Sequence, residues 1–149
     1  MLAPSTEAAM TTASFRLSSP KTLHAPTGYS HVADVRGGRI IYTAGQIAHD
    51  PSGALVGKDD LRAQLLQVFT NLKAAIESAG GSFHDVIKLS YFCCDRVAQA
   101  DLAGVREIRD QFINTQAPPI STFVFVSRLV RPDWLIEVEA VAVVGAAEQ

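Results

Sequence analysis

The sequence predicts an α+β domain with the element order β-β-α-β-α-β-β, in which two helices cover one face of a mixed sheet. Two stretches place apolar residues three and four positions apart, as one face of a helix requires. Shorter runs are rich in Val, Ile, Phe and Tyr or alternate apolar with polar residues, as strands do. The chain has 149 residues, which favours a single domain.

The first strands form a predicted hairpin. Residues 29–35 and 40–44 are the two strands, and the turn between them, residues 36–39, reads Arg-Gly-Gly-Arg. Paired glycines adopt the positive backbone angles that tight hairpin turns need. The dipeptide Gly-Gln at 45–46 ends the second strand, and a polar turn over residues 50–53 follows it.

Both helices are predicted from apolar spacing. Residues 59–78 form the longer helix, which Asp59 or Asp60 can cap and which the glycine pair at 80–81 ends. Residues 99–113 form the second helix. The apolar positions behind these predictions are Leu61, Leu65, Val68, Leu72 and Ile76 in the first helix, and Leu102, Val105, Ile108, Phe112 and Ile113 in the second.

Three further strands are predicted around the second helix. Residues 86–94 precede it, and residues 122–129 and 135–144 follow it. These strands carry apolar side chains on both faces, whereas helices on one side cover only one face of a sheet. The other face therefore needs a partner, and we expect a homo-oligomer with the sheet faces turned inward.

Composition narrows the class of protein. The chain is 48% hydrophobic and 19% charged, with a formal net charge of −2. A nucleic-acid partner is therefore not expected, and no membrane partner is expected because the apolar runs are too short to span a bilayer. Residues 1–20 are small and weakly patterned, so we predict a flexible N-terminal arm there, followed by one domain over residues 21–146.

Neither the cysteines nor the histidines predict a metal site, and no cofactor is expected. Cys93 and Cys94 are adjacent, so on a strand they point to opposite faces, and we expect reduced thiols in a cytoplasmic protein. The four histidines do not have the spacing of metal ligands. His31 lies two residues beyond Tyr29 on the same predicted strand face, which makes it the histidine to follow.

Three segments, YTAGQIAHDPSGALVG, AGGSFHDVIKLSYF and LIEVEAVAVV, together with the element order, resemble the RidA family, also called YjgF/YER057c/UK114. The resemblance runs from about Tyr29 to Val144, nearly the whole predicted domain. It implies a chorismate mutase-like, YjgF-like fold and a homotrimer with small-molecule pockets at the subunit interfaces. It also implies an enzyme that hydrolyses reactive enamines and imines, such as 2-aminoacrylate, to 2-keto acids and ammonia.

The resemblance places Ser121 where these deaminases keep an arginine. Their arginine lies in a Pro-x-Arg-Ser/Thr turn before a strand, whereas the aligned turn here, residues 119–122, reads Pro-Ile-Ser-Thr. Arg128 and Leu129 set this register because they match the family's Arg-Leu pair. A hydroxyl supplies no charge, and losing a charged hydrogen bond to a carboxylate costs on the order of 2–5 kcal/mol of binding free energy. We therefore predict specificity shifted away from 2-aminoacrylate.

The other pocket positions follow from the same resemblance. Glu139 matches the glutamate that positions the hydrolytic water, and it is the predicted catalytic residue. Arg106 stands where asparagine is frequent and would return a cation to the pocket from the second helix. Phe123 stands where cysteine often lies, so the pocket is more apolar. The predicted substrate-binding residues are Tyr29, Ala44, Gly45, Arg106, Ser121 and Phe123.

Alternatives remain for these residues and for the function. Arg106 also fits a solvated helix side, Ser121 also fits the end of a turn, and Glu139 also fits a solvated strand edge. A homotrimer that binds a small metabolite without turnover is the second hypothesis for the whole protein. The third hypothesis is ribonuclease activity, which the resemblance also implies because some family members have it. The net charge of −2 argues against this hypothesis.

Overall fold

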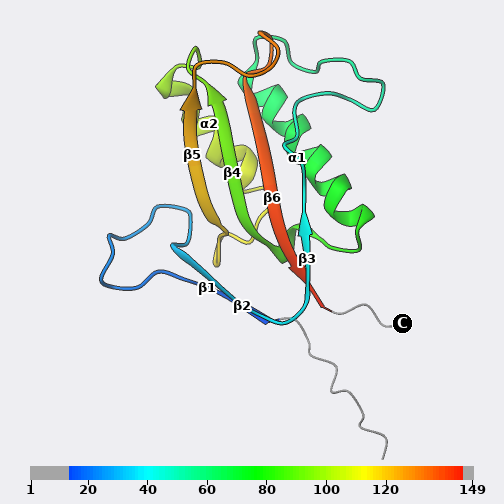
Figure 1. Ribbon diagram of the computed structural model, residues 1–149. Coiled ribbons are helices and arrows are strands. Elements are labelled where there is room, and N and C mark those ends of the chain that lie inside the picture. Colours follow the sequence, from blue (N-terminus) through cyan, green and yellow to red (C-terminus); the bar gives the residue numbers. More distant parts are fainter. Residues whose placement is uncertain (1–13, 146–149) are drawn as a thin grey trace, which may run out of the picture.

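The computed structural model describes residues 14–145 and confirms the predicted α+β fold (Figure 1). One strand comes in addition to the predicted order, at its start. The elements are β1 (Ser14–Ser18), β2 (Val32–Arg36), β3 (Arg39–Tyr42), α1 (Leu61–Ser78), the 3₁₀ turn η1 (Phe83–Asp85), β4 (Val86–Cys94), the 3₁₀ turn η2 (Gln99–Asp101), α2 (Leu102–Arg109), β5 (Ile120–Val126) and β6 (Ile136–Val144).

The main sheet has four strands in the order β3-β6-β4-β5. β6 runs antiparallel to both of its neighbours, and β4 and β5 run parallel, so the sheet is mixed as predicted. Figure 1 shows α1 and α2 side by side behind this sheet, which leaves its other face uncovered by any helix of the described chain. No helix among residues 14–145 is both long and apolar enough to cross a membrane.

β1 and β2 form a separate two-stranded antiparallel sheet. β1 was not predicted and lies in the segment expected to be a flexible arm; the arm's first thirteen residues lie outside the described part. A strand this short has little local signal, and its backbone partner comes only after a loop. β2 also starts at Val32 instead of Tyr29, so Tyr29 lies in the loop before it.

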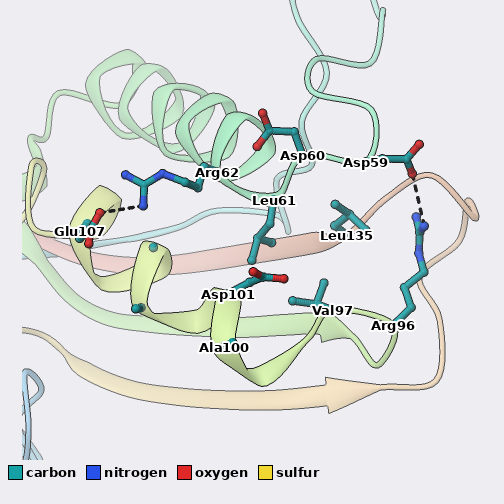
Figure 2. Close-up of a pocket in the computed structure, with 12 residues that line it drawn as sticks. Asp59, Asp60, Leu61, Arg62, Arg96, Val97, Ala100, Asp101, Glu107 and Leu135 are labelled. Carbon is teal, nitrogen blue, oxygen red and sulfur yellow. Dashed lines mark hydrogen bonds and ion pairs between the residues drawn. The ribbon is translucent and has the colours of Figure 1, made fainter.

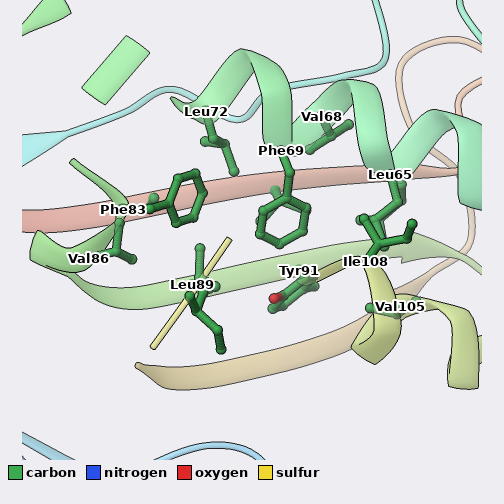
Figure 3. Packing of buried hydrophobic residues seen from close by; sticks show 14 of the residues in the cluster. Leu65, Val68, Phe69, Leu72, Phe83, Val86, Leu89, Tyr91, Val105 and Ile108 are labelled. Atoms are coloured by element: carbon green, nitrogen blue, oxygen red, sulfur yellow. The ribbon is translucent and has the colours of Figure 1, made fainter. Parts of the chain in front are cut away.

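α1 packs an apolar stripe onto the sheet, as its spacing predicted (Figure 3). The Asp60 side chain caps the helix by accepting a hydrogen bond from the Ala63 amide at 3.0 Å, and Gly80, with φ +83°, follows its end. The stripe residues with no exposed surface are Leu65, Val68, Phe69, Leu72 and Ile76. Phe69 lies at the centre of the view in Figure 3, between Phe83 and Tyr91.

α2 is shorter than the predicted helix over residues 99–113. It starts at Leu102 after the turn η2 and ends at Arg109. Beyond Arg109 the chain turns, and Phe112 and Ile113 pack onto the core from that turn instead of from a helix. The apolar spacing correctly predicted that Phe112 and Ile113 pack onto the core. A residue can pack onto the core without being part of the helix, so the predicted helix was too long.

β5 begins earlier than predicted, at Ile120 instead of Thr122, and ends at Val126. Its parallel pairing with β4 explains the shift, because Ile120 is already opposite Lys88 and Ser121 opposite Leu89. Ser121 therefore lies inside a strand and not in the turn before it. The prediction of a turn residue at this position is wrong.

A buried glutamine connects α1 to the start of β6, the strand that carries Glu139. Gln64 has no exposed surface. Its Nε2 donates to the carbonyls of Gly57 (3.1 Å) and Asp133 (2.8 Å), and its Oε1 accepts from the Leu135 amide at 2.9 Å. Every hydrogen-bonding group of this side chain except one lone pair is thus used, and β6 starts at a defined place over the helix.

The uncovered face of the sheet is partly apolar. Ile40 and Tyr42 of β3 are 50% and 75% exposed, and Val124 of β5 is 39% exposed. Between them β6 presents Glu137, Glu139 and Val141 in alternation with its buried residues. An apolar sheet face without cover is the feature that predicted an oligomer.

Candidate active site

The predicted site residues lie on opposite faces of the sheet. Ser121 is opposite Leu89, and Phe123 is opposite Tyr91, whose rings stack at 5.3 Å, so both lie on the face that the helices cover. Glu139 is opposite Ser90, on the uncovered face. Cross-strand partners share a face. A single chain therefore does not bring Ser121 and Glu139 into one pocket.

The first group, which we call the edge group, comprises Tyr29, Arg106, Ser121 and Phe123. Ser30 brings Tyr29 to β5: its Oγ donates to the Pro118 carbonyl at 2.7 Å, and its amide donates to the Pro119 carbonyl at 3.2 Å. Ser30 also forms a parallel bridge with Ile120, the residue before Ser121. Tyr29 therefore sits beside the chain that leads into Ser121.

Arginines of α2 hold the loop that precedes Tyr29. Arg106 donates to the Thr27 carbonyl, and Arg109 Nη1 donates to the Gly28 carbonyl at 2.7 Å. Gly28 has φ +77°, a backbone conformation that favours glycine. Arg106 thus contacts the loop before Tyr29 with one of its donors used on backbone, and the side chain is otherwise exposed.

The Tyr29 hydroxyl is engaged by His24. His24 Nε2 lies 2.8 Å from Tyr29 Oη. His31, the histidine that the sequence pointed to, packs edge-on against both rings, with centroids 4.8 Å from His24 and 5.2 Å from Tyr29. The role of His24 was not predicted because His24 lies in a loop, where no periodicity indicates which side chains meet.

The second group, which we call the carboxylate group, comprises Ala44, Gly45, Glu137 and Glu139. Gly45 lies between two points where the chain pairs with β6: Thr43 donates its amide to Ala140, and Gln46 exchanges backbone hydrogen bonds with Val138 at 2.8 and 3.1 Å. Glu137 lies directly over Gly45, because a Cβ on Gly45 would come within 2.0 Å of Glu137 Oε1. Ala44 is the residue before this contact.

The environment of Glu137 favours its protonated form. Burial raises the pKa of the Glu137 carboxyl above its usual value, and the nearby charge of Glu139 raises it further. A carboxyl group with a raised pKa beside a second carboxylate is an arrangement suited to taking and returning a proton. The sequence singled out Glu139, two residues further along the same face. The contact that distinguishes Glu137 joins β6 to a distant loop and has no local signal.

A cavity of about 770 Å³ lies away from both groups (Figure 2). It opens between the start of α1 and the start of α2, and no predicted site residue lines it. Its two arginines are already paired: Arg62 Nη1 with Glu107 Oε2 at 2.7 Å, and Arg96 with Asp59 at 3.5 Å. Since its basic groups have partners within the cavity, we do not assign the chemistry to it.

A family model, curated relatives and solved structures all match this chain. A family model described as Endoribonuclease L-PSP matches residues 20–144. A RutC family protein of Pyrococcus horikoshii is 37% identical over 108 residues, which are 72% of this chain and 82% of that protein. The Rid family protein YyfB of Yersinia pestis has a TM-score of 0.77 at 33% identity, covering 87% of this chain and 98% of its own. E. coli TdcF, solved with bound serine, has a TM-score of 0.61 at 30% identity, covering 86% and 93%.

Proposed function

The chain belongs to the endoribonuclease L-PSP family, which includes the RidA and YjgF proteins, and on this premise we propose that it is a cytoplasmic RidA-like hydrolase. Its substrate would be a small imine, enamine or related C–N compound. The observation that carries the proposal is Glu137, a carboxyl group with a raised pKa that lies against the bare backbone of Gly45. TdcF, to which the chain is similar, binds serine, and this supports a ligand of amino-acid size.

In the proposed reaction, a carboxylate of β6 activates water. As the water oxygen bonds to the C=N carbon, Glu137 takes a water proton, and the C=N electron pair moves to nitrogen, which gains that proton. The C–N bond of the resulting carbinolamine then breaks. The hydroxyl proton passes to the departing nitrogen, so that one water is consumed and a carbonyl compound and ammonia are released. Glu139, the carboxylate that the resemblance selected, is the other candidate for this role.

The proposed pocket lies between two copies of the chain in a homotrimer. The edge group and the carboxylate group lie on opposite faces of one sheet. A pocket that combines Ser121 with Glu137 therefore requires the edge group of one subunit and the carboxylate group of the next. The exposed side chains of Ile40, Tyr42 and Val124 support an assembly that covers this sheet face.

The proposed specificity is for less acidic, more apolar substrates. Ser121 offers a hydroxyl but no charge, and Phe123 brings an aromatic ring into the edge group. The same two residues also support the alternative function, a trimer that binds a small metabolite and does not turn it over. The choice between the two rests on whether the carboxylate group performs chemistry.

Ammonia release by the purified protein tests the proposal. The substrates are imines generated enzymatically from amino acids, both acidic and apolar, with 2-aminoacrylate included. We expect release from apolar imines well above the uncatalysed rate and little acceleration with 2-aminoacrylate, whereas a family member that retains the arginine should accelerate both. No acceleration for any imine by an intact trimer would reject the hydrolase and leave the binding function.

Restoring the arginine is expected to restore carboxylate binding. In Ser121→Arg, the affinity for pyruvate, a small 2-keto acid, should rise by about 30-fold to several-thousand-fold, the size of a charged hydrogen bond to a carboxylate. Titration calorimetry measures the dissociation constant. Ser121→Gln is the matched control, because glutamine is a long polar side chain without a charge. Its affinity for pyruvate should rise little. An equal gain in both variants would show that charge at this position is not the missing element.

A further inference from the structure

We propose that His24 sets the hydrogen-bond direction of the Tyr29 hydroxyl and thereby decides, according to pH, whether the site prefers ligands that accept or ligands that donate a hydrogen bond. Neither His24 nor this pairing follows from the family resemblance. The consequence for ligands rests on the proposed function, because it takes Tyr29 as a wall of the pocket. The pairing itself is a property of one chain and can be tested without any ligand.

The pairing is built into a loop that is fixed at several points. On one side of Tyr29, the α2 arginines hold the carbonyls of Thr27 and Gly28. On the other side, Ser30 is bonded to the Pro118 and Pro119 carbonyls. The backbone is therefore fixed on both sides of Tyr29, and the Tyr29 hydroxyl lies 2.8 Å from His24 Nε2.

His31 completes the arrangement and has a defined proton. Its Nε2 lies 3.0 Å from the His24 carbonyl oxygen. A carbonyl only accepts, so His31 Nε2 must carry the hydrogen and donate it. His31 thus anchors the backbone of His24, and its ring packs edge-on against both partners. Among the described residues, the His24 ring has one hydrogen bond, the one with Tyr29.

The contact has two forms because His24 can carry one proton or two. A tyrosine hydroxyl has one hydrogen to donate and an oxygen that accepts. When His24 is protonated, its Nε2–H donates to Tyr29 Oη, and the tyrosine hydrogen is free to point at a ligand. When His24 is neutral with its hydrogen on Nδ1, Nε2 accepts the tyrosine hydrogen, and only the lone pairs of Oη face a ligand. Histidine is the side chain that changes charge near neutral pH.

Several charged groups lie around His24 and Tyr29, and only some of them can change charge near neutral pH. Arg106 and Arg109, which hold the loop from α2, keep their charge at any pH of interest, and Asp110 is paired with Arg109 at 2.6 Å. His31 is the second group that can change charge, and it contacts the His24 backbone and the Tyr29 ring. Any test must therefore separate His24 from His31.

The ligand classes follow from these two forms. With His24 protonated, Tyr29 donates, which suits a carboxylate or carbonyl oxygen. With His24 neutral and its hydrogen on Nδ1, Tyr29 accepts from the ligand, which suits an ammonium or a protonated imine. A site that lacks the family's arginine would thus hold a keto-acid product more tightly at acidic pH and a protonated imine more tightly at alkaline pH.

The first experiment follows Tyr29 itself by NMR of protein labelled with ¹³C at tyrosine Cζ. The chain has three tyrosines, so the spectrum is simple, and Tyr29→Phe assigns the signal. The spectrum is recorded between about pH 5 and pH 8, the range in which histidine side chains in general change charge. The Tyr29 signal should shift over this range, and the shift should vanish in His24→Gln and persist in His31→Gln. Tyr91, whose pKa burial raises, is the internal reference for an intact fold. A Tyr29 signal that does not move, or that moves equally in His24→Gln, overturns the proposal.

The second experiment measures pyruvate affinity over the same pH range. The wild-type protein should bind pyruvate about 3- to 10-fold more tightly at the acidic end, the size of one hydrogen bond. In His24→Gln, this His24-dependent gain should be lost, while His31→Gln should retain it. A gain that is undiminished in His24→Gln would overturn the control of ligands by His24. Absence of turnover in the ammonia assay with both results intact would reject only the hydrolase.

Discussion

Glu137→Gln is expected to reduce ammonia release by about 10²- to 10⁴-fold, the usual contribution of a positioned acid or base. Glutamine keeps the shape and the contact with Gly45 but cannot take a proton. Stability should not fall with activity. Since the pKa of Glu137 is raised in the folded protein, ionising it above that pKa costs stability, and the neutral glutamine avoids this cost at neutral pH. Steady-state ammonia release and thermal unfolding at neutral pH measure the two effects.

Glu139→Gln is the matched control on the same strand and face. Removing the Glu139 charge removes one cause of the raised pKa of Glu137. We therefore expect Glu139→Gln to keep most of the activity and to move the acid limb of the rate profile to lower pH. If Glu139→Gln is the variant that loses turnover, the assignment from the resemblance is right and the assignment to Glu137 is wrong.

Phe69→Ala is expected to lower the free energy of unfolding by about 3–5 kcal/mol, the range for truncating a buried phenylalanine. Phe69 has no exposed surface, and its ring packs within 5.2–6.4 Å of the rings of Phe83, Tyr91 and Phe112. These residues come from η1, β4 and the turn after α2, so the cavity would lie where the two layers of the fold meet (Figure 3). Denaturant unfolding at one fixed protein concentration measures the change.

Leu66→Ala is the control for this substitution, because Leu66 lies on the same helix and is 43% exposed. It should cost about 0.5 kcal/mol or less, as substitutions away from the core usually do. A loss in Phe69→Ala no larger than that in Leu66→Ala would contradict the central place of Phe69 in the core.

Much of the fold could be predicted because its signals are local. α1 repeats apolar residues over five turns between a capping aspartate and a glycine, and β4 is a mainly apolar run interrupted by Lys88 and Ser90. β4 therefore has the predicted bounds, and α1 starts only two residues later than predicted. β1 and the end of α2 were missed. The pairing of β1 depends on a partner beyond a loop, and the residues after Arg109 are buried by a turn that preserves the helical spacing of apolar positions.

The candidate site could be predicted less well. Ser121, Tyr29 and Glu139 stand out in the sequence and lie in the two groups, whereas Glu137 has no local signal that marks it. Their spatial relation was not visible, because the side that Ser121 faces depends on where β5 begins to pair with β4. A shift of one residue in that register would turn it to the other face.

Composition and periodicity by themselves determined the α+β class, the helix over α1, the apolar excess on one sheet face and the absence of basic character expected of a nucleic-acid partner. These properties depend on total composition or on a repeated spacing of residues along the chain, so they can be read from the sequence without a structure. Only the tertiary structure decided that Glu137 lies on Gly45, that His24 meets Tyr29 and that the two groups face opposite sides of the sheet. Each of these is a contact or an orientation set by packing between distant segments or within loops, where no local repeat specifies the geometry.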